Sequence, residues 1–229
     1  VRLVGSEMCI RDSYRNGELC DAVISRIGIR SIEFRGSEGL YINGKSFEDK
    51  LMGVNRHQDY AYIGNAVPNN LHWLDVKKMR DAGFRIIRSA HYPQDPAFMD
   101  ACDELGMFII VATPGWQYWN SDPMFEKRIL SDIRNMVRRD RNHPSVLLWE
   151  PILNETAFPE SFAQNAYRAT HEEYPAPGCY AAIDDLSKGA LGYDVLYTAP
   201  KNETYYQELG KSCFTREYGD CVDDWNSHN

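Results

Sequence analysis

Two glutamates stand directly after strand-like segments of the chain. Glu155 ends the stretch LLWEPILNE, in which an apolar run at 146–149 is followed by the polar pair Asn154 and Glu155. Glu217 lies in the later segment SCFTREYG. Cleavage of a glycosidic bond uses two carboxyl groups, one protonated to assist the leaving oxygen and one ionised to attack or to activate water. The glutamates are candidates for such a pair, although a surface turn or salt-bridged loop glutamates would also explain them.

Strand-like and helix-like segments alternate from residue 51 onward. Seven short apolar segments read as strands: LMGVN, FRIIRSA, MFIIVA, SVLLW, CYAAI, DVLYTA and SCFTREYG. Segments of helical periodicity are clear between the first five and weak after residue 182; the clear ones are NNLHWLDVKKMRDAG, DPAFMDACDELG, FEKRILSDIRNMVRRDRN and PESFAQNAYRATHEEY. Uniformly apolar strands alternating with helices are typical of a parallel sheet covered on its faces.

We therefore predict an α/β fold, a (β/α)8 TIM barrel over residues 37–229. Such barrels average about 250 residues, so we expect this one to be truncated before its eighth strand. The exposed edges would then make this exact chain inactive or poorly soluble. An open doubly wound sheet is the alternative architecture, but no glycine-rich phosphate loop follows the first strand.

The residues before the barrel divide into two parts. Residues 1–13, VRLVGSEMCIRDS, show neither strand nor helix periodicity and no signal-peptide order, so we expect a non-native leader. Residues 14–36 alternate loosely in polarity and are β-branched, as in the tail of a β-sandwich. Asn43 and Gly44 then give a hairpin signal.

Polar residues follow most of the predicted strands, where a TIM barrel has its active face. They are Asn55, Arg56, His57, Arg88, His91, Thr113 to Trp116, Asn154, Glu155, Asp184, Asp185, Arg216 and Glu217. The fourth and seventh strands lie on opposing walls of an eight-stranded ring, so Glu155 and Glu217 can face each other. His57, His91 and Asp59 lack HxxxH or HxH spacing, so no metal site is predicted.

The charge of the chain limits its partners. There are 25 basic and 33 acidic residues, which give a net charge of −8 without long blocks of one sign. A nucleic-acid partner is disfavoured because phosphate binding needs a basic face. No run of about 18 apolar residues predicts a membrane span. Localisation is not readable, and bacterial periplasm and cytoplasm are both compatible.

Four segments resemble motifs of glycoside hydrolase family 2, which contains β-galactosidases, β-glucuronidases and β-mannosidases. DRNHPSVLLWEPILNE at 140–155 resembles the acid/base signature of this family, and IRSAHYPQDPAFMDACDELGMFII at 87–110 resembles its other signature. GVNRHQ at 53–58 is similar to the first barrel strand, and TREYG at 215–219 to the nucleophile strand. The motifs occur in the order of the family, and their joint occurrence is specific.

The resemblance implies a retaining exo-β-glycosidase preceded by an immunoglobulin-like sandwich. By motif, Glu155 becomes the general acid/base, Asn154 the amide that binds the sugar 2-hydroxyl, and Glu217 the nucleophile. β-D-Galactosides are favoured as substrates. The alternatives are a β-glucuronidase or β-mannosidase of the same family, or a barrel that only binds carbohydrate. No cofactor is required, although some members bind accessory magnesium or sodium, and a full-length parent can form homo-oligomers.

The remaining site residues have supporting roles. His57 and His91 match positions that bind sugar hydroxyls, although a buried histidine that holds a loop is the alternative. Arg88 is the candidate that keeps the nucleophile charged. Trp116 is a sugar platform or plain packing.

Two features bear on the acid/base. Glu155 needs a raised pKa, which apolar neighbours such as Trp149 could supply. Glu150 stands where the family pattern prefers Gly or Ser and adds a third carboxylate near the strand end. It is expected either to pair with an arginine or to mark a subgroup with different loop geometry. The interval between Glu155 and Glu217 is also short for the family.

Overall fold

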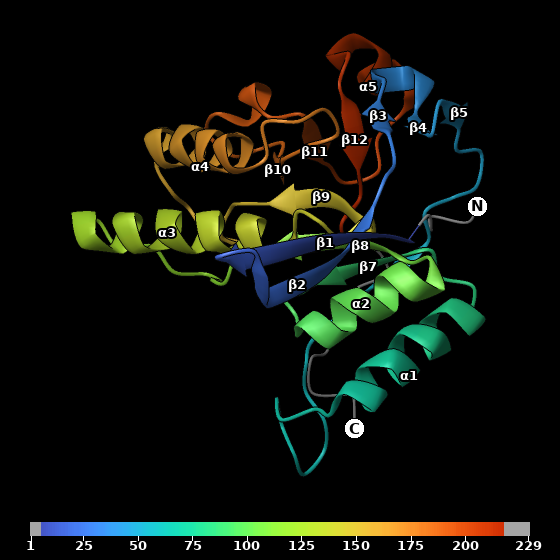
Figure 1. Ribbon diagram of the computed structural model, residues 1–229. Coiled ribbons are helices and arrows are strands. Elements are labelled where there is room, and N and C mark those ends of the chain that lie inside the picture. The colour runs from blue at the N-terminus through green and yellow to red at the C-terminus, as the bar shows by residue number, and fades with distance from the viewer. Residues whose placement is uncertain (1–5, 218–229) are drawn as a thin grey trace.

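Seven parallel strands form the central sheet of the protein, whose computed structural model describes residues 6–217, with side chains from residue 10 onward (Figure 1). The strands are β6 (Gly53–Arg56), β7 (Ile86–Ser89), β8 (Phe108–Ala112), β9 (Val146–Glu150), β10 (Ala182–Asp184), β11 (Val195–Tyr197) and β12 (Ser212–Phe214). They pair in chain order as β6-β7-β8-β9 and β10-β11-β12. A parallel bridge between Trp149 and Ala181 joins the two groups. This is the predicted barrel order, and the truncation stays a prediction.

Helices connect consecutive strands and cover the outer face of the sheet (Figure 1). They are α1 (Asn69–Asp81), α2 (Pro96–Leu105), α3 (Pro123–Asp140), α4 (Glu160–Glu173) and α5 (Glu203–Leu209), with the 3-10 turn η2 (Ala190–Gly192) between β10 and β11. The ends of α2 follow from sequence: Asp95 accepts the Ala97 backbone N–H at 2.8 Å, and Gly106 ends the helix in the left-handed conformation. The helical connections shorten after β10, as the weak periodicity there predicts.

Alternation along the strands divides the core into an inner and an outer layer. Ile86, Ile110 and Leu148 belong to the inner cluster. Ile87 and Trp149 belong to the outer cluster, which packs against α1, α2 and α3. Because neighbouring strand residues point to opposite faces, Glu150 lies on the inner side of the sheet when Trp149 lies on the outer side.

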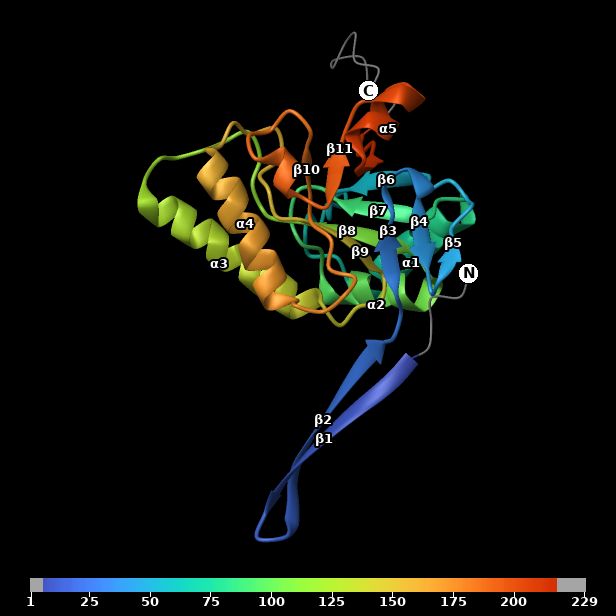
Figure 2. The ribbon, with the colours of Figure 1, turned by 90° about the horizontal axis from the view of Figure 1, so that it is seen from above.

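The first two strands form a hairpin that extends away from the rest of the molecule (Figure 2). β1 (Ser6–Arg15) pairs antiparallel with β2 (Glu18–Gly28). The expectation of no strand in residues 1–13 is therefore wrong. Asn16 and Gly17 form the turn with φ of 52° and 84°, the conformation that an Asn-Gly hairpin favours, and this dipeptide could have revealed the strand pair.

A small antiparallel sheet follows the hairpin and packs against the inner core. It contains β3 (Ile32–Phe34), β4 (Leu40–Ile42) and β5 (Lys45–Ser46), with the 3-10 turn η1 (Gly36–Glu38) after β3. The turn between β4 and β5 has Asn43 and Gly44 at positive φ, as predicted. Ile32 and Leu40 belong to the inner cluster of the barrel. The assignment of residues 14–36 to a sandwich stays a prediction.

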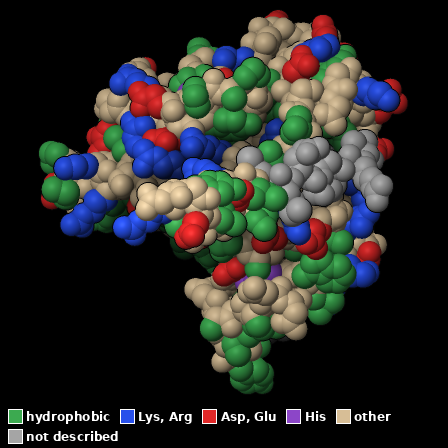
Figure 3. All heavy atoms as spheres, viewed as in Figure 1, with side chains coloured by type: hydrophobic (Ala, Val, Ile, Leu, Met, Phe, Trp, Pro, Cys, Tyr) green, Lys and Arg blue, Asp and Glu red, His purple; other side chains and the backbone are tan. Residues whose placement is uncertain are grey.

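The surface carries both signs of charge. On the face shown in Figure 3, acidic and basic side chains both occur, as the dispersed charges of the sequence indicate. Within residues 6–217, no helix has the length and apolar character needed to cross a membrane.

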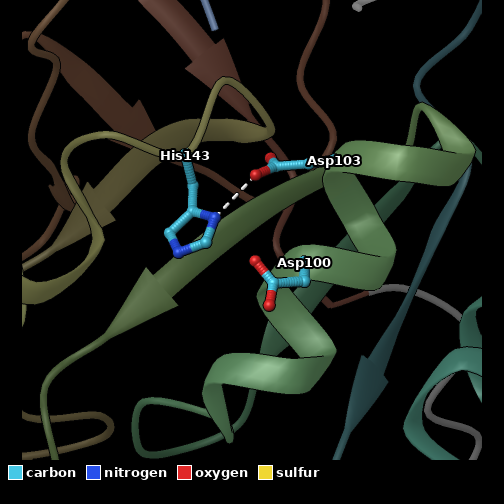
Figure 4. Close-up of side chains that lie close together, drawn as sticks. All are labelled: Asp100, Asp103 and His143. Carbon is cyan, nitrogen blue, oxygen red and sulfur yellow. Dashed lines mark hydrogen bonds and ion pairs between the residues drawn. The ribbon is translucent and has the colours of Figure 1, made fainter. Parts of the chain in front are cut away.

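A histidine–aspartate pair joins α2 to the entrance of β9 (Figure 4). His143 Nδ1 lies 2.6 Å from Asp103 Oδ2, and the other Asp103 oxygen accepts the Ser145 backbone N–H at 3.0 Å. Burial lowers the pKa of His143, but the hydrogen bond to Asp103 and the charges of Asp103, Asp140 and Asp100 outweigh it, so the pKa is raised.

We expect this pair to stabilise the chain at low pH. Because the folded pKa of His143 is raised, its contribution is complete below about pH 6.5, the ordinary unfolded value, and is lost as pH rises through the folded pKa. Urea unfolding of wild type and His143→Gln at about pH 5.5 and about pH 8.5 should show the larger free-energy difference at the lower pH. In an Asp103→Asn background this pH dependence should become smaller, because only the charges of Asp140 and Asp100 still raise the pKa of His143. An equal difference at both pH values in the wild-type background contradicts the assignment.

Candidate active site

A cavity of about 1420 Å³ opens at the carboxyl ends of the barrel strands. Its lining includes the seven residues to which the sequence assigned a catalytic or substrate-binding role: His57, Arg88, His91, Trp116, Asn154, Glu155 and Glu217. These residues follow or end β6, β7, β8, β9 and β12, so the parallel array gathers them from five strand ends. The cavity also extends between β12 and β6 to apolar residues such as Phe34 and Phe47.

Arg88 is the centre of the polar contacts in this cavity. Its side chain is 3% exposed. Nη1 donates to Glu217 Oε1 at 2.7 Å, and Nη2 donates to Asn154 Oδ1 at 3.1 Å. Nε and Nη2 donate to the two oxygens of Glu150 at 2.7 and 2.6 Å. Burial acts against the charge of Arg88, but the charge and hydrogen bonds of Glu150 outweigh it and raise the pKa of the guanidinium.

Glu217 accepts hydrogen bonds from donors on two strands. Besides Arg88, Asn55 Nδ2 donates to Glu217 Oε1 at 3.2 Å. The Glu217 side chain is 29% exposed, so one part of it faces the open cavity. An ionised carboxylate that is fixed by two donors and open on one side can act as a nucleophile.

Glu155 is held by donors from the loop after β8. Trp116 Nε1 donates to Glu155 Oε2 at 2.9 Å, and Gln117 Nε2 donates to the same oxygen at 2.7 Å. These two hydrogen bonds lower the pKa of Glu155. The expectation that Trp149 raises this pKa is wrong, because Trp149 is buried in the outer core. Glu155 also adopts a φ of 48°, a region that side chains other than Gly, Asn and Asp rarely occupy.

The two predicted histidines, His57 and His91, line the cavity together with Glu155. The rings of His57 and His91 meet edge to face, with centroids 5.8 Å apart, and His91 stacks on Trp116 at 6.2 Å with an interplanar angle of 17°. Burial and the charge of Arg88 lower the pKa of His91. Within the described residues, His91 Nδ1 is buried without a hydrogen-bond partner. A neutral imidazole nitrogen of this kind can exchange a hydrogen bond with a ligand hydroxyl.

Other strand-end residues have structural partners. Arg56 does not line the cavity and instead pairs with Asp75 at 2.8 Å. Arg216 pairs with Asp184 at 3.1 Å. Gln117 and Tyr197 also contact the site but were not predicted from the sequence. Tyr197 donates to Glu150 Oε2 at 3.1 Å. Gln117 could have been predicted because it is polar and directly follows Trp116, whereas no neighbouring residue distinguishes Tyr197 from other strand tyrosines.

Among the described residues, one group has the spacing of metal ligands, and it lies outside the cavity. Asp100, Asp103 and His143 have ligand atoms within 4.8 Å of one another. The hydrogen bonds of Asp103 to His143 and to the Ser145 backbone account for this grouping without an ion.

Comparison with known proteins gives consistent matches. A model of "Glycosyl hydrolases family 2, TIM barrel domain" matches residues 32–176. A β-galactosidase of Thermoanaerobacterium thermosulfurigenes is 36% identical over 156 residues, 68% of this chain and 21% of that protein. A putative β-glucuronidase of Formosa agariphila is 37% identical over 139 residues, 58% of this chain and 16% of that protein. The structure of a glycosyl hydrolase family 2 member from Bacteroides cellulosilyticus has a TM-score of 0.77 at 26% identity, over 91% of this chain and 30% of that one.

The chain spans only part of the length of its curated relatives. It covers about a fifth of the β-galactosidase of Thermoanaerobacterium thermosulfurigenes and about a fifth of a β-galactosidase of Thermoanaerobacter pseudethanolicus. The family match covers more than half of the chain and includes β6 to β9, from which most of the cavity residues come. The chain therefore belongs to glycosyl hydrolase family 2, and its residues 32–176 match the TIM-barrel domain of that family.

Proposed function

We propose that the full-length protein carrying this sequence is a retaining exo-β-glycosidase that hydrolyses terminal β-D-galactosides. The observation that supports this most is that Glu155 and Glu217 line the same cavity, one beside a stacked pair of aromatic rings and one beside a buried arginine. The names of relatives, which include β-galactosidases and a putative β-glucuronidase, support the class of activity.

The reaction follows from the environments of the two glutamates. A carboxylate oxygen of Glu217 attacks the anomeric carbon, the bond to the leaving oxygen breaks, and that oxygen takes the proton of Glu155. Water then attacks the same carbon and gives a proton to Glu155, and Glu217 leaves as a carboxylate. Retention requires the two carboxyls to be about 5 to 5.5 Å apart across the bound sugar.

Substrate binding has to change the surroundings of Glu155. In the free protein, the donors Trp116 and Gln117 favour its ionised form. Proton donation therefore requires Glu155 to give up these hydrogen bonds when the leaving group enters. Asn154 Nδ2 lies 3.4 Å from His91 Nε2, and both groups face the cavity in which the sugar hydroxyls would bind.

The charges around the cavity favour a neutral sugar. Arg88 is already paired with Glu150 and Glu217, and Arg216 is paired with Asp184. A uronate carboxylate that binds either of these arginines would have to displace one of their partners and would meet the charge of Glu155 nearby. We therefore place galactosides ahead of glucuronides.

We expect the full-length protein to hydrolyse aryl β-D-galactosides in preference to aryl β-D-glucuronides and β-D-mannosides. The measurement is kcat/KM for a matched panel of 4-nitrophenyl glycosides. Preference for the glucuronide would overturn the substrate assignment. The absence of turnover on every β-glycoside would overturn the enzymatic function and favour the barrel that only binds carbohydrate.

The two glutamates should be separable by azide. Glu217→Ala and Glu155→Ala should each lower kcat/KM by about 10²- to 10⁴-fold or more. Azide with Glu217→Ala should give the α-glycosyl azide, because it attacks in place of the nucleophile. Azide with Glu155→Ala and an activated aryl glycoside should give the β-azide, because it attacks the covalent intermediate. Glu172 is an exposed glutamate on α4, so Glu172→Ala is the control and should retain activity. If the two variants gave the opposite azide products, Glu155 would be the nucleophile and Glu217 the general acid/base.

Trp116→Phe should shift the basic limb of the kcat/KM profile. The indole donor lowers the pKa of Glu155, so its removal raises that pKa and moves the basic limb to higher pH. Trp119→Phe is the matched control, because Trp119 packs against Phe125 and Phe162 outside the cavity. A basic limb that stays in place in Trp116→Phe, or that also moves in Trp119→Phe, would contradict the role of this hydrogen bond.

A further inference from the structure

Glu150 is a third carboxylate in the site, and the reaction described above does not use it. It is the last residue of β9 and is 0% exposed. A buried carboxylate is costly unless it is paired and hydrogen-bonded. Its position on the inner side of the sheet places it next to Arg88, which lines the cavity and contacts Glu217.

The contacts of Glu150 are complete and converge on Arg88. Both oxygens accept from the guanidinium, at 2.6 and 2.7 Å, and Tyr197 adds a hydroxyl donor at 3.1 Å. The remaining guanidinium nitrogen, Nη1, donates to Glu217. One buried cation therefore bridges a permanent carboxylate and the candidate nucleophile.

The charge of this group changes during the proposed reaction. In the free protein, Glu150, Arg88 and Glu217 carry −1, +1 and −1. In the covalent intermediate Glu217 is an ester without charge, so it no longer balances Arg88. A buried guanidinium that loses its counter-ion is strongly unfavourable, whereas Arg88 still has Glu150 at this stage.

We propose that Glu150 is a positioning residue that holds and neutralises Arg88 throughout the reaction, so that Glu217 can alternate between carboxylate and glycosyl ester. This inference rests on the proposed function. Glu150 does not touch the reacting atoms and acts through Arg88. Consistent with this role, Glu150 contributes more than Glu217 to the raised pKa of Arg88.

Several charged or titratable groups face this pair. From the elements packed around Glu150 and Glu217 they are His91, Asp184, Tyr197 and Arg216, together with Arg88 itself. All of these groups are unchanged in the variants described below. A change in the pH profile of kcat/KM can therefore be attributed to the carboxylate that was substituted.

The test uses Glu150→Gln in the full-length protein. The amide keeps the shape and removes the charge, so Arg88 pairs with Glu217 alone. The ionised nucleophile is then favoured, and we expect the acid limb of kcat/KM to move down by about one pH unit. We also expect formation of the covalent intermediate, followed by trapping with a 2-deoxy-2-fluoro aryl glycoside, to slow about tenfold or more, because the ester leaves Arg88 without a counter-ion.

Controls separate this role from stability alone. Asp140 is also 0% exposed and accepts two hydrogen bonds from one arginine, Arg139, at 2.7 and 2.8 Å. Asp140→Asn should therefore reduce stability without moving the acid limb. Glu150→Asp keeps the charge and should restore the acid limb at least in part. If the glutamine variant does not fold, Glu150→Ser removes the same charge and takes its place in the test.

The outcomes are distinct. Wild-type protein without turnover of any aryl β-glycoside overturns the proposed function and this inference with it. An active wild type whose Glu150→Gln variant keeps the same acid limb and the same trapping rate overturns this inference alone. An acid limb that moves equally in Asp140→Asn also overturns it.

Discussion

The site depends on a single buried guanidinium. Arg88 leaves β7 and connects Glu150 at the end of β9 with Glu217 after β12, and it also reaches Asn154. Strands that are far apart in the sequence are thereby fixed relative to one another at the mouth of the barrel. Because arginine presents several donors in one rigid plane, a lysine at this position could not hold three partners in the same geometry.

Much of the fold could be predicted from the sequence because each strand and helix is marked by residues within or next to it. Each strand from β6 to β12 is a short apolar run, and helices with caps such as Asp95 and Gly106 separate them. The polar pair Asn154 and Glu155 was recognisable because it lies shortly after a buried strand, β9, which ends at Glu150. All seven predicted site residues line one cavity, although their chemical roles stay predictions.

Partners that lie far apart in the sequence were the least predictable. An arginine was among the expected partners of Glu150, but Arg88 lies 62 positions away and Tyr197 comes from a further strand, so neither residue was named. The surroundings of Glu155 were wrongly assigned because strand alternation turns Trp149 outward, and the residues that contact the carboxylate come from the loop after β8. Strand β2 lies in a segment that was expected to be extended, but β1 was missed because residues 1–13 show no strand periodicity, and only the Asn16-Gly17 turn marks the pairing of the two strands.

The left-handed backbone conformation at Glu155 is unfavourable for folding, although the proposed reaction requires a glutamate at this position. With φ at 48°, this position suits glycine, which would relieve steric crowding between side chain and main chain. Under the proposed function, a glycine at this position would stabilise the folded chain but would remove the proton donor. The rarely occupied backbone conformation therefore falls on the residue to which the proposed reaction assigns the proton transfer.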